Sequence, residues 1–261
     1  LGIRQAFLLT ISSWLVISLF GSIPFMYSSS SLSYTDAFFE SVSGITTTGA
    51  TVINNLENLS EGILIWRSLL QWFGGIGIIV LAMAILPTLQ IGGMQLLHME
   101  HDDPYEKTIP KVNRFVIELF LLYIFLSIIC GLLYFVNGME VFDSIIHALT
   151  TISTGGFSNY DDSFLFFNSF QIEIISVIFM LVGSLPFVLY LQFLHSQKIL
   201  IFKDDQIKLF FIILVIIIFL TTVWLNTNQS LDLMSSFRIA LFNITSILTG
   251  TGYTSSNFSN W

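Results

Sequence analysis

The stretch Thr48-Gly49-Ala50-Thr51 closes an apolar segment that is too short to cross a lipid bilayer. Two further segments of the same kind end in Thr154-Gly155-Gly156-Phe157 and Thr251-Gly252-Tyr253-Thr254. Gly49 and Gly155 are 106 residues apart, and Gly155 and Gly252 are 97 residues apart. This spacing indicates an internal repeat of about one hundred residues, blurred by loop insertions.

The composition is that of a membrane protein. Of the 261 residues, 54% are hydrophobic and only 10% are charged, whereas soluble domains average roughly 25% charged residues. The mean hydropathy is +0.82. The single cysteine, Cys130, lies inside an apolar run, so the sequence predicts neither a disulfide framework nor a zinc cluster built on cysteines.

Five apolar runs are long enough to cross the hydrocarbon core, which requires about 20 helical residues. They cover residues 6–27, 62–86, 112–136, 169–194 and 207–226. A short segment follows the first, the third and the fifth run. We therefore expect an all-α membrane protein built from repeats of an outer helix, a pore loop and an inner helix. The expected repeats are residues 1–97, 98–198 and 199–261, the third ending after its pore loop.

The first short segment, residues 36–47, has twelve residues. As a helix rising about 1.5 Å per residue it reaches only about halfway through the membrane. A chain that enters halfway and returns leaves non-helical backbone at membrane depth, and this backbone has to line water or protein because lipid cannot satisfy it. The three segments are therefore predicted to be re-entrant pore loops.

Charged residues predict the orientation. Seven of the nine basic residues fall on one side of the spans, which should be cytoplasmic: Arg4, Lys107, Lys111, Arg114, Lys198, Lys203 and Lys208. The segments on the opposite side are acidic, with Asp161 and Asp162 beside the second loop. We expect these carboxylates to concentrate cations at the pore mouth, and we expect Asp36 and Asp143 to cap the first two pore helices.

The residue types at the loop tips suit a filter that would hold a dehydrated potassium ion. Successive backbone carbonyls can replace the water shell of the ion if they point at one axis, and glycine allows the required backbone angles. The short helix behind each loop directs its negative carboxyl end towards the cation. The predicted filter residues, acting mainly through backbone carbonyls, are Thr48, Gly49, Ala50, Thr154, Gly155, Gly156, Thr251, Gly252 and Tyr253.

Four stretches of the chain carry a resemblance to a known family. They are Asp36-Ala-Phe-Phe-Glu-Ser-Val-Ser-Gly-Ile-Thr-Thr-Thr-Gly-Ala-Thr51, Gln71-Trp-Phe-Gly-Gly-Ile-Gly-Ile-Ile79, Leu86-Pro87 and Gly92-Gly-Met-Gln95. Together they closely resemble the Trk/Ktr/HKT superfamily of potassium transporters, specifically the TrkH-type subunits of bacterial potassium uptake systems. The resemblance covers the whole chain.

The resemblance implies a pseudo-fourfold channel of four repeats that takes up potassium across the bacterial inner membrane, with the pore loops facing the periplasm. It implies a homodimer surrounded by membrane lipid, gated by a cytosolic nucleotide-binding regulatory subunit. Gly49, Gly155 and Gly252 would be the filter glycines of the first three repeats. Relatives with serine at the position of Gly49 tend to conduct sodium, so glycine implies a preference for potassium. Because the sequence stops at Trp261, we expect the parent chain to continue with a fourth filter.

Two other classes of function were weighed. A non-conducting or regulatory relative that kept the fold is the alternative, and intact filter glycines argue against it. An intramembrane enzyme is disfavoured because the sequence offers no nucleophile paired with a base at membrane depth. We expect potassium as the substrate, no organic cofactor and no nucleic-acid partner. The sequence leaves open whether uptake is channel-like or symport with protons or sodium.

Overall fold

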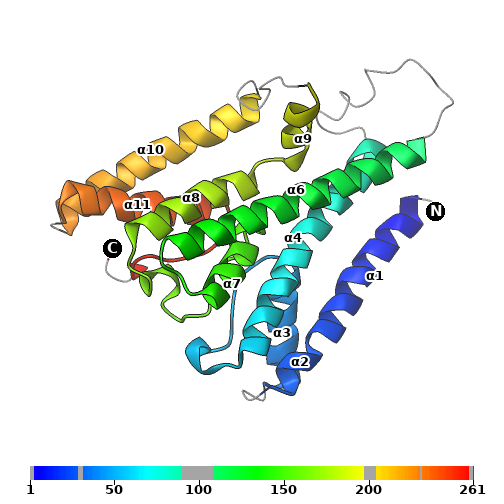
Figure 1. Ribbon diagram of the computed structural model, residues 1–261, viewed down its shortest axis with the longest axis horizontal. Coiled ribbons are helices and arrows are strands. Elements are labelled where there is room, and N and C mark those ends of the chain that lie inside the picture. The colour runs from blue at the N-terminus through cyan, green and yellow to red at the C-terminus, as the bar shows by residue number, and fades with distance from the viewer. Residues whose placement is uncertain (1–2, 29–31, 90–107, 197–203, 230, 259–260) are drawn as a thin grey trace.

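The computed structural model describes residues 3–28, 32–89, 108–196, 204–229, 231–258 and 261. In these ranges all regular secondary structure is helical, which confirms the predicted all-α class (Figure 1). The long helices are α1 (Ile3–Gly21), α4 (Glu61–Leu89), α6 (Thr108–Val136) and α10 (Asp205–Asn228). Helices α4, α6 and α10 each contain a stretch that is long and apolar enough to cross a membrane, and a fourth such stretch, Leu8–Met26, runs from α1 through α2 (Ile23–Met26). These agree with four of the five predicted spans.

The fourth predicted span, residues 169–194, is not one straight helix. It forms α8 (Phe170–Ser184) and α9 (Phe187–Ser196), which meet at an angle of 92°. Pro186 lies at the break, and it disfavours helical geometry in the residue before it. Leu185 accordingly takes an extended conformation with ψ 150°. The run is helical and apolar on both sides of the break, but Pro186 divides it, so one continuous span is not confirmed.

Three short helices lie beside the long ones: α3 (Tyr34–Ile45), α7 (Val141–Ile152) and α11 (Leu233–Leu248). Helix α3 packs between α1 and α4, α7 packs against α6 and α8, and α11 packs against α8 and α10 (Figure 1). A short helix, α2 (Ile23–Met26), and two single 3-10 turns, η1 (Leu56–Asn58) and η2 (Ser163–Leu165), complete the described elements. Outer helix, short helix and inner helix therefore follow one another twice, and the third outer and short helices follow them.

The short helices begin with different caps. The cap of α3 is Ser33 and not Asp36 as predicted: the Ser33 hydroxyl accepts a hydrogen bond from the backbone N–H of Asp36, which lies in the first turn, and donates one to its carboxylate. Asp232 caps α11 by accepting from the N–H of Ser235 at 3.1 Å. The prediction for Asp143 is wrong, because its carboxylate accepts hydrogen bonds from Asn159 and Tyr160 instead. The returning loop, not the helix end, is what Asp143 stabilises.

Two glycines let the inner helices approach the carboxyl ends of the short helices. A Cβ atom at Gly74 of α4 would collide with the carbonyl oxygen of Ile45, and a Cβ atom at Gly183 of α8 would collide with that of Ile152. Ile45 and Ile152 are the last residues of α3 and α7. The loop that follows each short helix is therefore held directly against an inner helix.

Candidate ion-conducting site

The three loops share one backbone pattern. Gly49, Gly156 and Gly252 all have left-handed backbones, with φ between 77° and 85°. The N–H of each glycine bonds to a carbonyl six residues earlier, on Ser43, Thr150 and Ser246 respectively. Only glycine adopts this conformation without penalty. These three glycines are structurally equivalent positions.

This register corrects the predicted alignment of the second loop. Gly155 was expected to match Gly49 and Gly252, but its φ is not left-handed and its N–H occupies the place of those of Thr48 and Thr251. The equivalent glycine is Gly156. The sequence motif Thr-Gly misled the alignment because the second loop contains two consecutive glycines.

The loops meet one another closely. A Cβ atom at Gly49 would collide with the carbonyl oxygen of Gly155, and a Cβ atom at Gly156 would collide with that of Thr251. The first loop therefore touches the second, and the second touches the third. The structure thus brings the predicted filter residues of all three loops to one place, although they come from segments about one hundred residues apart.

A buried polar side chain on each short helix stabilises the returning part of its own loop. These residues are Glu40, His147 and Asn243, each nine positions before the left-handed glycine and each 0% exposed. The carboxylate of Glu40 accepts from the Thr51 hydroxyl and the Val52 N–H. His147 Nε2 lies 3.0 Å from the Ser158 hydroxyl. Asn243 bonds the N–H and the hydroxyl of Ser255. The sequence analysis missed this position because its residue type differs in every repeat.

Arg67 of α4 forms a buried ion pair with Glu40, with Nε 2.8 Å from Oε1. Its guanidinium also donates to the Ser158 carbonyl at 3.1 Å and to the Thr51 hydroxyl at 3.2 Å, and it lies over the Phe157 ring, 4.1 Å from the centroid. One side chain therefore connects the first loop to the second. The sequence analysis overlooked Arg67, although a charge inside an apolar span is a signal worth testing.

Gln71 lies one helical turn after Arg67 and contacts the same loop. Its Nε2 donates to the Gly155 carbonyl at 2.6 Å, and its Oε1 accepts from the Phe157 N–H at 3.0 Å. Gln71 is completely buried. The first inner helix thus holds three backbone groups of the second loop, at residues 155, 157 and 158.

The second and third loops are joined through Tyr253. Its hydroxyl lies 2.5 Å from the Thr150 hydroxyl and 3.2 Å from that of Thr151, both on α7. Tyr253 is 1% exposed. Nearby, Arg238 of α11 forms an ion pair with Glu173 of α8 at 2.8 Å. Side chains therefore fix each described loop relative to its neighbour.

The acidic residues around the loops are largely structural. Asp161 accepts hydrogen bonds from the backbone N–H groups of Asn55 at 2.7 Å and Leu56 at 3.0 Å, which joins the first two loops. The Tyr160 hydroxyl donates to Asp143 at 2.7 Å, and burial together with this carboxylate raises the pKa of Tyr160. The exposed carboxylate of Asp162 remains available to attract cations. That these carboxylates concentrate cations stays a prediction, and Asp161 has a structural role in addition.

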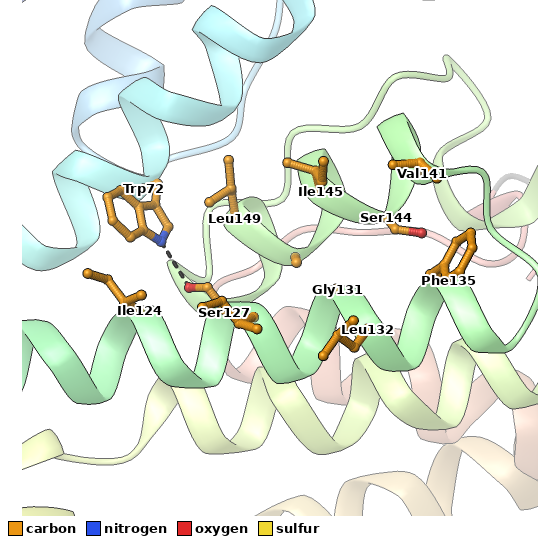
Figure 2. Close-up of a pocket in the computed structure, with 12 residues that line it drawn as sticks. Trp72, Ile124, Ser127, Gly131, Leu132, Phe135, Val141, Ser144, Ile145 and Leu149 are labelled. Carbon is orange, nitrogen blue, oxygen red and sulfur yellow. Dashed lines mark hydrogen bonds between the residues drawn. The ribbon is translucent and has the colours of Figure 1, made fainter.

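Other parts of the described structure offer less. Among the described residues, no group of three or more His, Cys, Asp or Glu side chains could hold a metal ion. An apolar groove of about 570 Å³ runs between α6 and α7, where the indole N–H of Trp72 donates to Ser127 at 2.9 Å (Figure 2). Its lining contains no charged side chain, so it is unsuited to carry ions.

Comparisons with known proteins agree with this architecture. The family model "TrkH: Cation transport protein" matches residues 1–261. The Trk system potassium uptake protein TrkI of Halomonas elongata is 40% identical over 98% of this chain and 52% of its own length. The Trk system potassium uptake protein TrkH of Vibrio parahaemolyticus is 40% identical over 99% of this chain and 55% of its own length.

A solved structure is similar as well. The crystal structure of the potassium transporter TrkH from Vibrio parahaemolyticus matches with a TM-score of 0.90 and 38% sequence identity, over 100% of this chain and 54% of that one. The chain thus spans about half the length of the relatives it matches. Since the family model covers every residue and the fold agrees, this chain belongs to the TrkH family of cation transport proteins.

Proposed function

We propose that this chain contributes three repeats, residues 1–97, 98–198 and 199–261, to a potassium uptake protein of the bacterial inner membrane. Potassium is the transported substrate, and the function is transport without an enzymatic step. The ion is held mainly by backbone carbonyls of Thr48, Gly49, Ala50, Thr154, Gly155, Gly156, Thr251, Gly252 and Tyr253. Gly49, Gly156 and Gly252 occupy equivalent positions in this filter.

The observation that carries the proposal is the convergence of three loops with the same left-handed glycine. Each loop follows a short helix whose carboxyl end faces the loop, which favours a cation there. In each loop, the N–H group of the left-handed glycine and that of the residue before it are already bonded to a carbonyl of the preceding short helix. The loop carbonyls are the groups that we propose to face an ion, as a carbonyl filter requires. Those of Ala50 and Gly155 also accept hydrogen bonds from the side chains of Ser43 and Gln71.

The proposal extends to orientation and partners. The first turns of α1, α6 and α10 lie at one end of the molecule, with the filter loops towards the other (Figure 1). Arg4, Lys111 and Lys208 belong to these first turns, which favours a cytoplasmic location for that end and a periplasmic location for the loops. By analogy with the family, we propose a homodimer in membrane lipid, with a cytosolic nucleotide-binding regulatory subunit. The relatives are named potassium uptake proteins of Trk systems, which supports potassium as the substrate and a further component as the partner.

The substitution Gly49→Ser tests the filter. Its Cβ would meet the Gly155 carbonyl, and the left-handed φ of 79° resists a side chain. In the protein expressed from its native gene, we expect normal membrane levels, slower potassium-limited growth of an uptake-deficient host, and increased sodium permeation. Gly62→Ser is the matched control, because no atom lies within 4 Å of a Cβ at Gly62. Unchanged ion selectivity in Gly49→Ser would remove Gly49 from the filter.

A further inference from the structure

The second loop differs from the other two at the position before its left-handed glycine. The first and third loops carry threonine there, and the hydroxyls of Thr48 and Thr251 lie 2.8 Å from those of Thr46 and Thr249. The second loop carries Gly155, which has no side chain to form such a pair. The backbone of Gly155 is not left-handed, so its conformation does not explain the glycine.

The neighbouring inner helix explains it. A Cβ atom at Gly155 would collide with the amide group of Gln71, whose three terminal atoms are its three nearest neighbours. The space that threonine fills in the other loops is occupied here by a side chain from another repeat. Gly155 is therefore a glycine for steric reasons, and Gln71 is the group it accommodates.

The contact fixes a carbonyl as well as filling space. Gln71 donates to the Gly155 carbonyl at 2.6 Å and accepts from the Phe157 N–H at 3.0 Å, so the two ends of one amide hold the backbone on both sides of Gly156. A carbonyl that accepts a hydrogen bond keeps a fixed direction and has less electron density to offer a cation. Both the direction and the strength of carbonyl dipoles are held to determine potassium selectivity.

Within the described structure, the contact of Gln71 with the second loop is particular to the first and second repeats. Gln71 lies three residues before Gly74 of α4, and the residue three before the corresponding Gly183 of α8 is Met180. Methionine cannot donate to a carbonyl. The third loop is held through Tyr253 instead.

We infer that Gln71 is a positioning residue for ion selectivity, which orients the Gly155 carbonyl of the second filter loop from the inner helix of the first repeat. This inference rests on the proposed potassium uptake. Gln71 touches the backbone of the proposed filter and would act on the ion through that backbone.

Gln71→Met removes both hydrogen bonds while keeping the length of the side chain. Measured in the protein expressed from its native gene, its potassium-to-sodium permeability ratio should fall by about tenfold or more, since a freed buried carbonyl and N–H both seek new partners. The control is Trp72→Phe on the same helix, which removes the hydrogen bond to Ser127 in the apolar groove between α6 and α7 (Figure 2). That variant should leave the permeability ratio unchanged. A wild-type ratio in Gln71→Met would overturn the inference.

A second pair of variants tests the steric half of the argument. Gly155→Ala should reduce potassium uptake at least tenfold, because its methyl group would collide with the buried amide of Gln71. Adding Gln71→Ala removes this amide and should restore uptake to within about threefold of Gln71→Ala alone. Gly156→Ala is the control that Gln71→Ala should not rescue, because its φ is 77° and its obstacle is the Thr251 carbonyl. Equal impairment of Gly155→Ala with and without Gln71→Ala would refute the steric explanation.

The comparison with Gly49→Ser separates this inference from the proposed function. A changed permeability ratio in Gly49→Ser with an unchanged ratio in Gln71→Met would leave the filter in place and remove only the role of Gln71. Unchanged ratios in both variants would reject the carbonyl filter itself, and the role of Gln71 with it.

Discussion

Replacing Arg67 by methionine should strongly destabilise the protein, because it breaks the buried ion pair with Glu40. Arg67 and Glu40 have side-chain exposures of only 2% and 0%. Removing one partner of a buried ion pair typically costs about 3–5 kcal/mol, because the other charge stays buried without compensation. Here Glu40 would keep only the Thr51 hydroxyl and the Val52 N–H.

The same substitution also frees the Ser158 carbonyl and removes the cation from the Phe157 ring. These losses place the expected cost in the upper part of that range. For a chain of this size each kcal/mol lowers the melting temperature by about 2–4 °C, so a cost of about 4–5 kcal/mol should lower it by about 8–20 °C. Thermal unfolding of the purified protein in detergent, followed by the loss of the monodisperse chromatographic peak, measures this decrease.

Two comparisons make the test specific to the buried pair. Combining Glu40→Gln with Arg67→Met removes the uncompensated charge, so the double variant should be more stable than Arg67→Met alone. Lys208→Met removes the exposed pair with Asp205, whose partners are 50% and 94% exposed, and it should change stability by at most about 1 kcal/mol. Equal melting temperatures for Arg67→Met and Lys208→Met would refute the assignment of Arg67 as the link between the loops.

Two further predictions concern the loops. Asp162→Asn should reduce uptake more at low than at high ionic strength, because exposed charges are screened over about 8 Å at physiological salt. Asp161→Asn should reduce uptake similarly at both ionic strengths, because Asp161 bonds two backbone N–H groups. Potassium flux measured at two salt concentrations distinguishes the two cases. Tyr253→Phe should lower the free energy of unfolding by about 1–3 kcal/mol through loss of its bonds to α7. An unaltered melting temperature for Tyr253→Phe would contradict this role.

The arrangement of helices could be predicted because it depends on length and hydropathy. A bilayer requires about 20 apolar residues for a span, and the shorter segments before Gly49, Gly155 and Gly252 could not meet this requirement. The same reasoning overlooked the bend at Pro186, because hydropathy averages over single residues. The family resemblance was confirmed by the match over residues 1–261.

The contacts within the site could not be predicted in the same way. On the second loop, Arg67 bonds Ser158 and Gln71 bonds Gly155, which lie 91 and 84 residues away along the chain, and no local sequence pattern predicts such pairs. The second loop was aligned one residue out of register because the sequence does not distinguish Gly155 from Gly156. In the structure only Gly156 has a left-handed backbone. Asp143 was predicted to cap α7 and instead bonds the returning loop. The bonds of Asp161 to two backbone N–H groups of the first loop also could not be predicted from sequence.

Each short helix carries a different buried polar residue nine positions before its left-handed glycine, and this difference bears on how such a protein can evolve. In an assembly of identical chains, one altered codon changes every copy of a position at once. Here Glu40, His147 and Asn243 are encoded separately, and each depends on its own partners. One loop can therefore be adjusted while the others keep their contacts, but exchanging the residue of one repeat for that of another should fail unless its partners move with it.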